Sequence, residues 1–254
     1  MNIVIIGSGN VATVMIKLMQ LNQINVLQVF SRNSSSVQEL GNKYKIETTS
    51  SIDAINKSAD IYLLCISDAA LTENLSYLNI INDKPIFHTA ASVSKEVLKN
   101  VSSNYGVIYP LQTLRKEMEA LPEIPLLIDA NNESTMQIAK SLSEKISTTV
   151  LFANDESRLK LHVAAVMVNN FTNHLFALAE DFCNKEQIDF KVLHPLIAET
   201  AKRAIQQSPA QMQTGPAVRN DIVTLEKHLQ LLHSYPELKT LYLSLSDSIM
   251  NHQR

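Results

Sequence analysis

The first twelve residues, MNIVIIGSGNVA, constrain the fold of this chain more than any other stretch. Residues 3–6 form a short β-branched apolar run of the kind that is buried in a parallel sheet. The run leads without a spacer into Gly7-Ser8-Gly9, and residues 11–20 are compatible with a helix. We therefore predict a strand, a glycine turn and a helix in that order.

This G-x-G-x-x-A pattern is typical of turns that bind the pyrophosphate of a dinucleotide. Gly7 permits the tight bend, Gly9 lets a phosphate approach the backbone, and Ala12 lets helix and strand pack closely. The N–H groups at the helix start, on Asn10 and Val11, can bind the negative charge. The alternative is a glycine turn without a ligand. The chain has only 5 glycines, so finding two of them here favours binding.

The residues after the second predicted strand, Asn25 to Phe30, indicate which dinucleotide binds. An NAD site usually has an acidic residue here, whereas an arginine favours the 2′-phosphate of NADP. The sequence has Ser31-Arg32-Asn33 and no acid at this position. The groups of Ser31 and Asn33 can also bind phosphate oxygens, so NADP(H) is the expected cofactor. The alternative is that Arg32 is a solvated loop charge.

Short apolar runs alternate with helix-compatible segments as far as Ala153. This alternation predicts an α/β fold with a doubly wound parallel sheet. The predicted strands are residues 3–6, 25–30, a short segment around 46, 61–66, 85–88, 107–109, 124–128 and 149–152, and the predicted helices include 37–44, 51–56 and 133–145. Polar residues that follow these strands, among them Ser67, Asp68 and Thr89, should face the crevice where such sheets bind ligands.

From Asn154 onward the apolar residues recur at helical spacing. The sequence therefore predicts a dinucleotide-binding domain over residues 1–153 and an all-helical domain over 154–254, with helices at 155–184, 190–207, 222–233 and 236–251. Residues 159–178 are apolar on most faces of their helix, so this helix is either buried or covered by a partner subunit. We expect a homodimer through the C-terminal helices.

His162 and Asn169 are seven residues apart, or about two helical turns, and so share one helix face with Asn170 beside them. An imidazole and amides are what a hydride-transfer site needs, so these three residues are the catalytic candidates. The alternative is that they satisfy one another or join helices at an interface. The candidate substrate-binding residues are Gln112, Thr113 and Arg219.

Composition and spacing exclude several other classes of protein. A net charge of −3 gives no basic surface for nucleic acid. The histidines lack metal-ligand spacing, and no G-x-S-x-G elbow indicates a hydrolase. No apolar run is long enough to span a membrane or to act as a secretory signal. Cys65 and Cys183 have no C-x-x-C spacing, so we expect reduced thiols and a cytoplasmic location.

Five motifs together resemble a known bacterial family. They are GSGNVA at residues 7–12, HTAAS at 88–92, YPLQT at 109–113, HVAAVMVNN at 162–170 and TGPAVRND at 214–221. The family has an N-terminal Rossmann-like domain and a C-terminal helical domain of unknown function, number 2520. It is similar to pyrroline-5-carboxylate reductases, ketopantoate reductases and 6-phosphogluconate-dehydrogenase-like proteins. The resemblance implies an NADP-dependent oxidoreductase that acts on a small carbonyl or imine compound.

The sequence departs from this family at two positions. Ala91 stands where the family tends to have glycine, and Tyr109 stands where it tends to have histidine. The lysine and asparagine one turn apart in related hydroxyacid dehydrogenases are also missing, because Lys160 is followed four residues later by Ala164. The alternative function is a non-catalytic NADP-binding or regulatory protein that keeps the fold.

Overall fold

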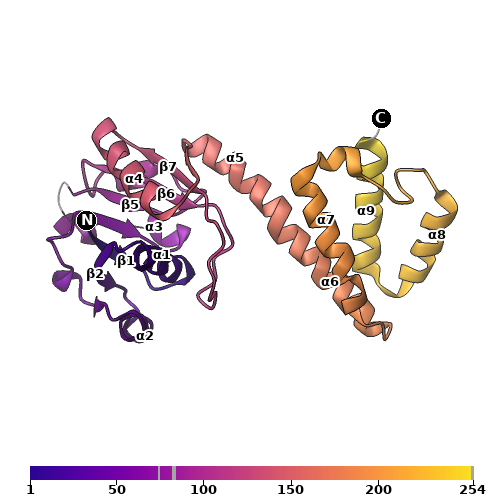
Figure 1. The fold of residues 1–254 in the computed structure, drawn as a ribbon, viewed down its shortest axis with the longest axis horizontal. Coiled ribbons are helices and arrows are strands. Elements are labelled where there is room, and N and C mark those ends of the chain that lie inside the picture. The colour runs from indigo at the N-terminus through magenta and orange to yellow at the C-terminus, as the bar shows by residue number, and fades with distance from the viewer. Residues whose placement is uncertain (74, 82–83, 253–254) are drawn as a thin grey trace. The chain divides into compact units, whose positions relative to one another are not determined.

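The computed structural model describes residues 1–73, 75–81 and 84–252 (Figure 1). Contacts within the chain divide it into two compact units, Met1–Asn170 and Phe171–Arg254. The first unit holds the sheet and the second consists of helices.

The first unit is built on an eight-stranded sheet with the strand order β3-β2-β1-β4-β5-β6-β7-β8. Neighbouring strands are parallel except β6 and β7, which are antiparallel. The strands are β1 (Asn2–Ile6), β2 (Asn25–Phe30), β3 (Glu47–Thr49), β4 (Ile61–Leu64), β5 (Ile86–His88), β6 (Tyr105–Pro110), β7 (Leu126–Ala130) and β8 (Val150–Phe152). The predicted doubly wound α/β sheet is therefore confirmed.

Two hydrophobic clusters cover the two faces of this sheet. Alternate side chains of β1 separate between them, with Ile3 and Ile5 in one cluster and Val4 and Ile6 in the other. The first cluster includes α1 (Asn10–Leu21), α2 (Ser34–Tyr44) and α4 (Glu133–Ile146), and the second includes α3 (Asp68–Thr72) and the 3₁₀ turns η1 (Ile52–Ala54), η2 (Ser76–Ile81) and η3 (Lys95–Leu98). Burial on both faces explains why the strands are continuous apolar runs.

The structure corrects several details of the sequence prediction in this unit. β7 is antiparallel to β6 because the loop over residues 111–125 returns directly, without the helical crossover that a parallel neighbour requires. The helix predicted at 51–56 is only the 3₁₀ turn η1, the strand predicted near 46 lies at β3, and the strand predicted at 61–66 ends at Leu64.

The long helix predicted at 155–184 begins as expected, but it is interrupted. It consists of α5 (Asp155–Ala165), a π-helical segment (Val166–Phe171) and α6 (Thr172–Lys185). The Asn154 side chain caps α5 by accepting a hydrogen bond from the Ser157 N–H at 2.9 Å. Many of its apolar side chains are exposed within one chain, including Leu159, Val163 and Val168. The chain itself therefore does not bury this helix.

The second unit contains α6, α7 (His194–Gln206), α8 (Ile222–Leu231) and α9 (Pro236–His252). The helices predicted at 190–207 and 222–233 each include a 3₁₀ turn, η5 (Phe190–Leu193) before α7 and η7 (Leu232–Ser234) after α8. A further turn, η6 (Pro209–Met212), lies in the predicted loop. Few apolar residues of this unit are buried, among them Cys183, Leu225 and Leu232.

Neither cysteine is paired, and both are buried. Burial raises the pKa of the Cys65 thiol to about 12, so this thiol is neutral and acts as a small apolar side chain.

Within the part of the chain that the structure describes, no helix combines the length and apolar character needed to cross a membrane.

Candidate functional site

The glycine turn between β1 and α1 has a backbone that only glycine fits well. Gly7 has a φ of +124°, and its N–H donates to the Phe30 carbonyl oxygen at 2.8 Å. A Cβ on Gly7 would lie 2.1 Å from the backbone oxygen of Cys65, so a side chain here is excluded. This close approach fixes the turn against the ends of β2 and β4.

Gly9 has a different role, because the space beside it is open. It is the N-cap residue of α1, and no side chain caps this helix. A Cβ built on Gly9 meets no atom within 4 Å. A phosphate can therefore approach the backbone and the first N–H groups of the helix, including those of Asn10 and Val11. The turn fits the pyrophosphate of a dinucleotide.

Three serine hydroxyl groups from separate segments meet beside the glycine turn. Ser8 Oγ donates to Ser31 Oγ at 2.9 Å, and Ser36 Oγ lies 3.0 Å from Ser8 Oγ. These groups adjoin a cavity of about 330 Å³ whose lining includes Gly7, Ser8, Gly9, Ser31, Arg32, Asn33 and Ser67. The structure thus brings most of the predicted cofactor-binding residues together around one cavity.

Arg32 lies at the rim of this cavity, with 67% of its side chain exposed. Its guanidinium is 3.9 Å from the Glu73 carboxylate, which is also exposed. The Asn33 side chain instead caps α2, because its oxygen accepts from the Ser36 N–H at 3.0 Å. Arg32 is therefore accessible to a phosphate. Binding one would break its ion pair with Glu73, which contributes little because both side chains are exposed.

Three other predicted cofactor-binding residues have side chains that form hydrogen bonds within the protein. Asn10 accepts a hydrogen bond on its side-chain oxygen from the Lys116 N–H at 3.1 Å. Thr89 is buried, and its hydroxyl donates to the Leu64 carbonyl oxygen at 3.1 Å. Asp68, at the start of α3, accepts a short hydrogen bond from the Ser92 hydroxyl.

A tyrosine and a histidine meet at the carboxyl end of β6. Tyr109 Oη lies 3.0 Å from His162 Nδ1, and the two rings pack edge to face with centroids 6.0 Å apart. Burial raises the pKa of Tyr109, the Asp68 carboxylate raises it further, and the Arg158 guanidinium opposes this shift. Tyr109 is therefore neutral near pH 7 and carries a proton that it can share with the imidazole.

The other predicted catalytic residues lie on the π-helical segment. The Asn169 amide donates a short hydrogen bond to the Thr113 hydroxyl, which follows β6. His162 and Asn169 thus both contact the end of β6 and the loop after it, which agrees with a shared face. π-Helical turns widen a helix locally and often occur at functional sites. Asn170 is exposed on the same segment.

The predicted substrate-binding residues fall in two places. The side chain of Gln112 donates to the Glu123 carbonyl oxygen at 3.2 Å and accepts from the Thr113 N–H at 2.9 Å, so it orders the start of this loop. Arg219 is exposed in the turn before α8, in the second unit.

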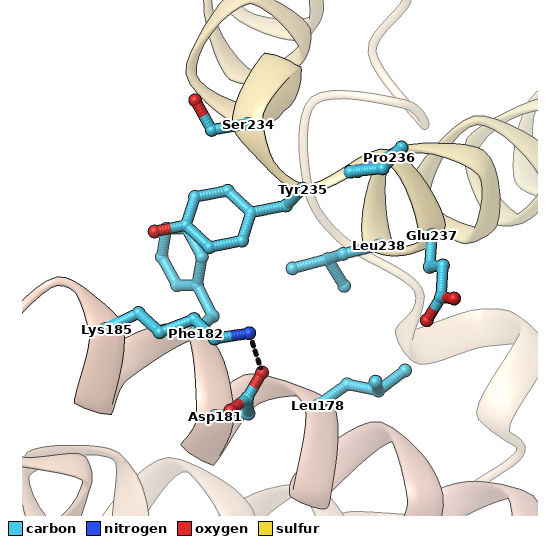
Figure 2. Close-up of a pocket in the computed structure, with 9 residues that line it drawn as sticks. All are labelled: Leu178, Asp181, Phe182, Lys185, Ser234, Tyr235, Pro236, Glu237 and Leu238. Carbon is cyan, nitrogen blue, oxygen red and sulfur yellow. Dashed lines mark hydrogen bonds and ion pairs between the residues drawn. The ribbon is translucent and has the colours of Figure 1, made fainter.

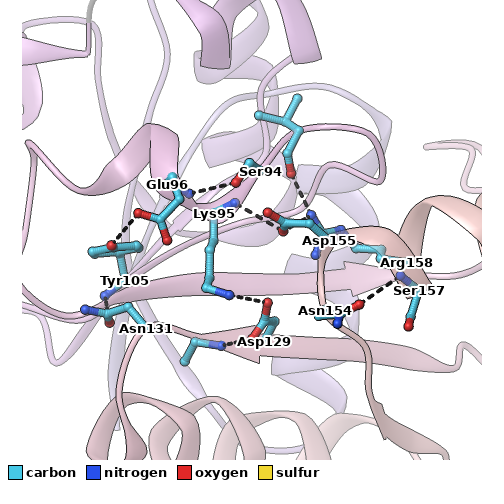
Figure 3. A network of polar contacts seen from close by, with 12 residues as sticks. Ser94, Lys95, Glu96, Tyr105, Asp129, Asn131, Asn154, Asp155, Ser157 and Arg158 are labelled. Carbon is cyan, nitrogen blue, oxygen red and sulfur yellow. Dashed lines mark hydrogen bonds and ion pairs between the residues drawn. The ribbon is translucent and has the colours of Figure 1, made fainter.

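Arg158 anchors α5 to the segment that follows β5 (Figure 3). Its guanidinium donates to the carbonyl oxygens of Ala91 at 3.1 Å and Val93 at 2.6 Å, and to the Asp155 carboxylate at 2.8 Å. Burial opposes ionisation of Asp155, but hydrogen bonds from Ser94, Arg158 and the Lys95 N–H outweigh it and lower the pKa of this carboxyl. These bonds fix the helix that carries His162.

His88 is fully buried next to this network, so its imidazole has no access to solvent. Its Nδ1 accepts from the Ala90 N–H at 3.2 Å. Burial, followed by the positive charge of Arg158, lowers the pKa of His88 to about 4. The imidazole is therefore neutral at physiological pH.

A separate cavity of about 180 Å³ lies in the second unit (Figure 2). Phe182 and Tyr235 pack edge to face there with ring centroids 5.1 Å apart, and Lys185 pairs with Asp181 at 2.6 Å. It adjoins an apolar cavity of about 350 Å³ that shares Phe182 and Leu238. Neither cavity contains a residue that the sequence singled out.

The sequence indicated Tyr109 only as a departure from the family pattern, without a role in the site, and gave no role to Arg158 or Lys116. Tyr109 ends a predicted strand, which was a usable signal because ligands bind at that edge. Arg158 has the spacing of an ordinary exposed helical ion pair, and the contact between Lys116 and Asn10 joins residues too far apart in sequence to predict.

The fold and the glycine turn define a dinucleotide-binding α/β protein with a helical C-terminal unit. The family described as NADP oxidoreductase, coenzyme F420-dependent, matches residues 2–92, and a domain of unknown function (DUF2520) matches residues 124–249. A candidate NADP oxidoreductase of Bacteroides fragilis is 36% identical over 98% of each chain, with a TM-score of 0.89. The chain belongs to this family of NADP oxidoreductases.

More distant solved structures share the fold. A protein from Thermotoga maritima is 19% identical, with 99% of this chain and 98% of that chain covered and a TM-score of 0.72. An imine reductase from Myxococcus stipitatus in complex with NADP⁺ is 16% identical, with 99% and 92% covered and a TM-score of 0.62. A sequence comparison with curated proteins gives no match. The predicted family and the predicted cofactor, NADP(H), are thus confirmed.

Proposed function

We propose that this protein is an NADP(H)-dependent oxidoreductase that transfers a hydride between the cofactor and a small carbonyl or imine compound. The observation that carries this proposal is the position of the Tyr109–His162 pair. Tyr109 lies near the carboxyl end of β6, and the glycine turn that fits a dinucleotide follows β1. These two strands point the same way in the sheet, so both features lie at the edge where such sheets bind ligands. Bound NADPH supplies the hydride, and the chain must supply the accompanying proton.

The proposed proton donor is Tyr109, with His162 as its partner. A neutral phenol can give its proton to a carbonyl oxygen or an imine nitrogen, and the imidazole 3.0 Å away can restore it. The Asn169 and Asn170 amides are proposed to orient the substrate, and Gln112 and Thr113 to bind it. Arg219 remains a proposed substrate-binding residue from the sequence.

Incubation with NADPH and a panel of keto acids and cyclic imines tests this function. We expect the absorbance of NADPH to fall with at least one compound, and we expect His162→Ala to abolish that turnover. NADPH binding without turnover of any compound would favour the non-catalytic alternative.

We also propose that the chain forms a homodimer through its C-terminal helices. α5 and α6 each expose apolar side chains, including Val163 on α5 and Leu175 and Phe176 on α6. Such surfaces are unfavourable in water unless another surface covers them. Sedimentation at micromolar concentration should give twice the 28.3 kDa of one chain, and a stable monomer would exclude the dimer.

A cytoplasmic location is proposed from the cysteines. Both thiols are buried and unpaired, which suits a reducing compartment. Cell fractionation should recover the protein with soluble cytoplasmic markers, and recovery with membranes would contradict the proposal.

A further inference from the structure

We propose that Lys116, with Lys43, binds the 2′-phosphate of NADP(H) from the side opposite Arg32. The loop between β6 and β7 would then contribute to cofactor selectivity. This inference rests on the proposed NADP(H)-dependent function.

The first support is a second cavity next to the serine cluster. This cavity of about 200 Å³ is lined by Ser8, Thr13, Ser36, Glu39, Leu40, Lys43, Tyr44, Lys116 and Glu117. Ser8 lines both this cavity and the one that contains Arg32. Ser31 lines the cavity with Arg32, Ser36 lines the cavity with the two lysines, and both are hydrogen-bonded to Ser8, so the serine cluster joins the two cavities. A phosphate bound by these hydroxyl groups would have cations on both sides.

The second support is the way the backbone of Lys116 is held. Its N–H donates to Asn10 Oδ1 at 3.1 Å, and its carbonyl oxygen accepts from Lys17 Nζ at 3.3 Å. Lys17 also donates to the Met118 carbonyl oxygen. Both backbone groups of Lys116 are thus fixed to α1, the helix that follows the glycine turn. The position of this lysine does not depend on its own side chain, which remains available for a ligand.

The third support is that the two lysines of the lining have no carboxylate partner. The lining holds two lysines, Lys43 and Lys116, and two carboxylates, Glu39 and Glu117. Among the described residues, neither lysine forms an ion pair with either carboxylate, and Glu117 lies 3.8 Å from Arg115 instead. Both ammonium groups are therefore available to an anionic ligand.

Calorimetric titration of the full chain with defined nucleotides tests the proposal. The probes are NADPH, NADH, adenosine 2′,5′-bisphosphate and 5′-AMP, because only the first and third carry a 2′-phosphate. The variants are Lys116→Ala, Lys43→Ala and, as matched control, Arg115→Ala. Arg115 belongs to the same loop and its loss removes the same charge, but it does not line the cavity and is 73% exposed.

We expect Lys116→Ala to lower the affinity of the protein for NADPH and for adenosine 2′,5′-bisphosphate about tenfold, because the variant loses one charge-assisted hydrogen bond. Lys43→Ala should act in the same direction. The affinities of these variants for NADH and 5′-AMP should change less than about twofold. Arg115→Ala should change the affinity for each of the four nucleotides by less than about twofold. Lys116→Arg should restore most of the NADPH affinity, because it keeps the charge.

Three results would overturn the inference while leaving NADP(H) binding intact. They are unchanged NADPH affinity in Lys116→Ala, equal losses for NADPH and NADH, and an equal effect of Arg115→Ala. Equal wild-type affinity for NADPH and NADH would instead overturn the cofactor assignment itself. Thermal unfolding followed by circular dichroism checks that each variant is folded.

Discussion

The hydroxyl oxygen of Tyr109 lies 3.0 Å from Nδ1 of His162, so the end of β6 is joined to α5 by a hydrogen bond between two groups that can exchange a proton. His162 is the residue that helical spacing selected as a catalytic candidate. Its partner stands where the related family tends to have a histidine. The departure from the family pattern therefore does not remove a proton donor from this region, because a neutral phenol can take that role.

Replacing Tyr109 by phenylalanine removes this hydroxyl group while keeping the ring. If the phenol donates the proton, kcat with an accepted carbonyl or imine substrate should fall by about 10²- to 10⁴-fold. The dissociation constant of NADPH should stay within about twofold. Tyr105→Phe is the matched control, because Tyr105 lies on the same strand and its hydroxyl binds Glu96 at 2.9 Å. Similar kcat values for the two variants would refute the assignment.

The two glycines of the turn should respond differently to alanine. Gly7→Ala places a Cβ 2.1 Å from a backbone oxygen at a φ of +124°, so we expect a loss of at least about 2 kcal/mol in the free energy of unfolding. Gly9→Ala meets no protein atom, so it should cost less than about 1 kcal/mol. Its methyl group should nevertheless weaken NADPH binding at least tenfold, because it occupies the space where the phosphate approaches. Urea denaturation and NADPH titration measure the two effects, and unaltered NADPH affinity in Gly9→Ala would count against this turn as the binding site.

Arg158 should contribute far more to stability than an exposed ion pair. Its side chain is 1% exposed, and its removal takes a donor from two buried carbonyl oxygens and one of several donors from the Asp155 carboxylate. Arg158→Met should therefore lower the free energy of unfolding by about 3–5 kcal/mol. Arg203→Met breaks an exposed pair with Glu199 and should cost less than about 0.5 kcal/mol. Urea midpoints compare the two, and equal small effects would mean that Arg158 is not a structural anchor.

His88 should make stability depend on pH in a defined direction. Its folded pKa of about 4 lies below the ordinary value of 6.5, so the unfolded chain binds the proton more readily between these values. Stability from this group is present above pH 6.5 and is lost as the pH falls toward 4. The loss between pH 7 and pH 5 should be about 2 kcal/mol. His88→Asn keeps an acceptor for the Ala90 N–H but does not titrate, so its free energy of unfolding should fall by about 2 kcal/mol less over this range.

Local patterns predicted the strands and most helices, because burial on both sheet faces requires apolar runs and the solvated helix faces require polar residues. The antiparallel direction of β7 was not predictable from such patterns. It depends on the loop over residues 111–125 returning without a crossover, and the sequence between β6 and β7 does not reveal this.

The site was predictable to a smaller extent, for physical reasons. Gly7 and Gly9 are specified by local backbone geometry, which a short motif records. The contacts of Arg158 with Ala91 and of Lys116 with Asn10 join distant segments, and only the folded sheet brings these segments together. Contacts of this kind leave no periodic signal in a single sequence.

NADP(H) is expected to bind at the glycine turn, with its 2′-phosphate beside Arg32. Titration of wild type and Arg32→Ala with NADPH and NADH measures this recognition. We predict that the wild type binds NADPH at least tenfold more tightly than NADH. Arg32→Ala should reduce NADPH affinity by about ten- to a hundredfold and leave NADH affinity nearly unchanged. Tighter binding of NADH than of NADPH by the wild type would show that the 2′-phosphate is not recognised.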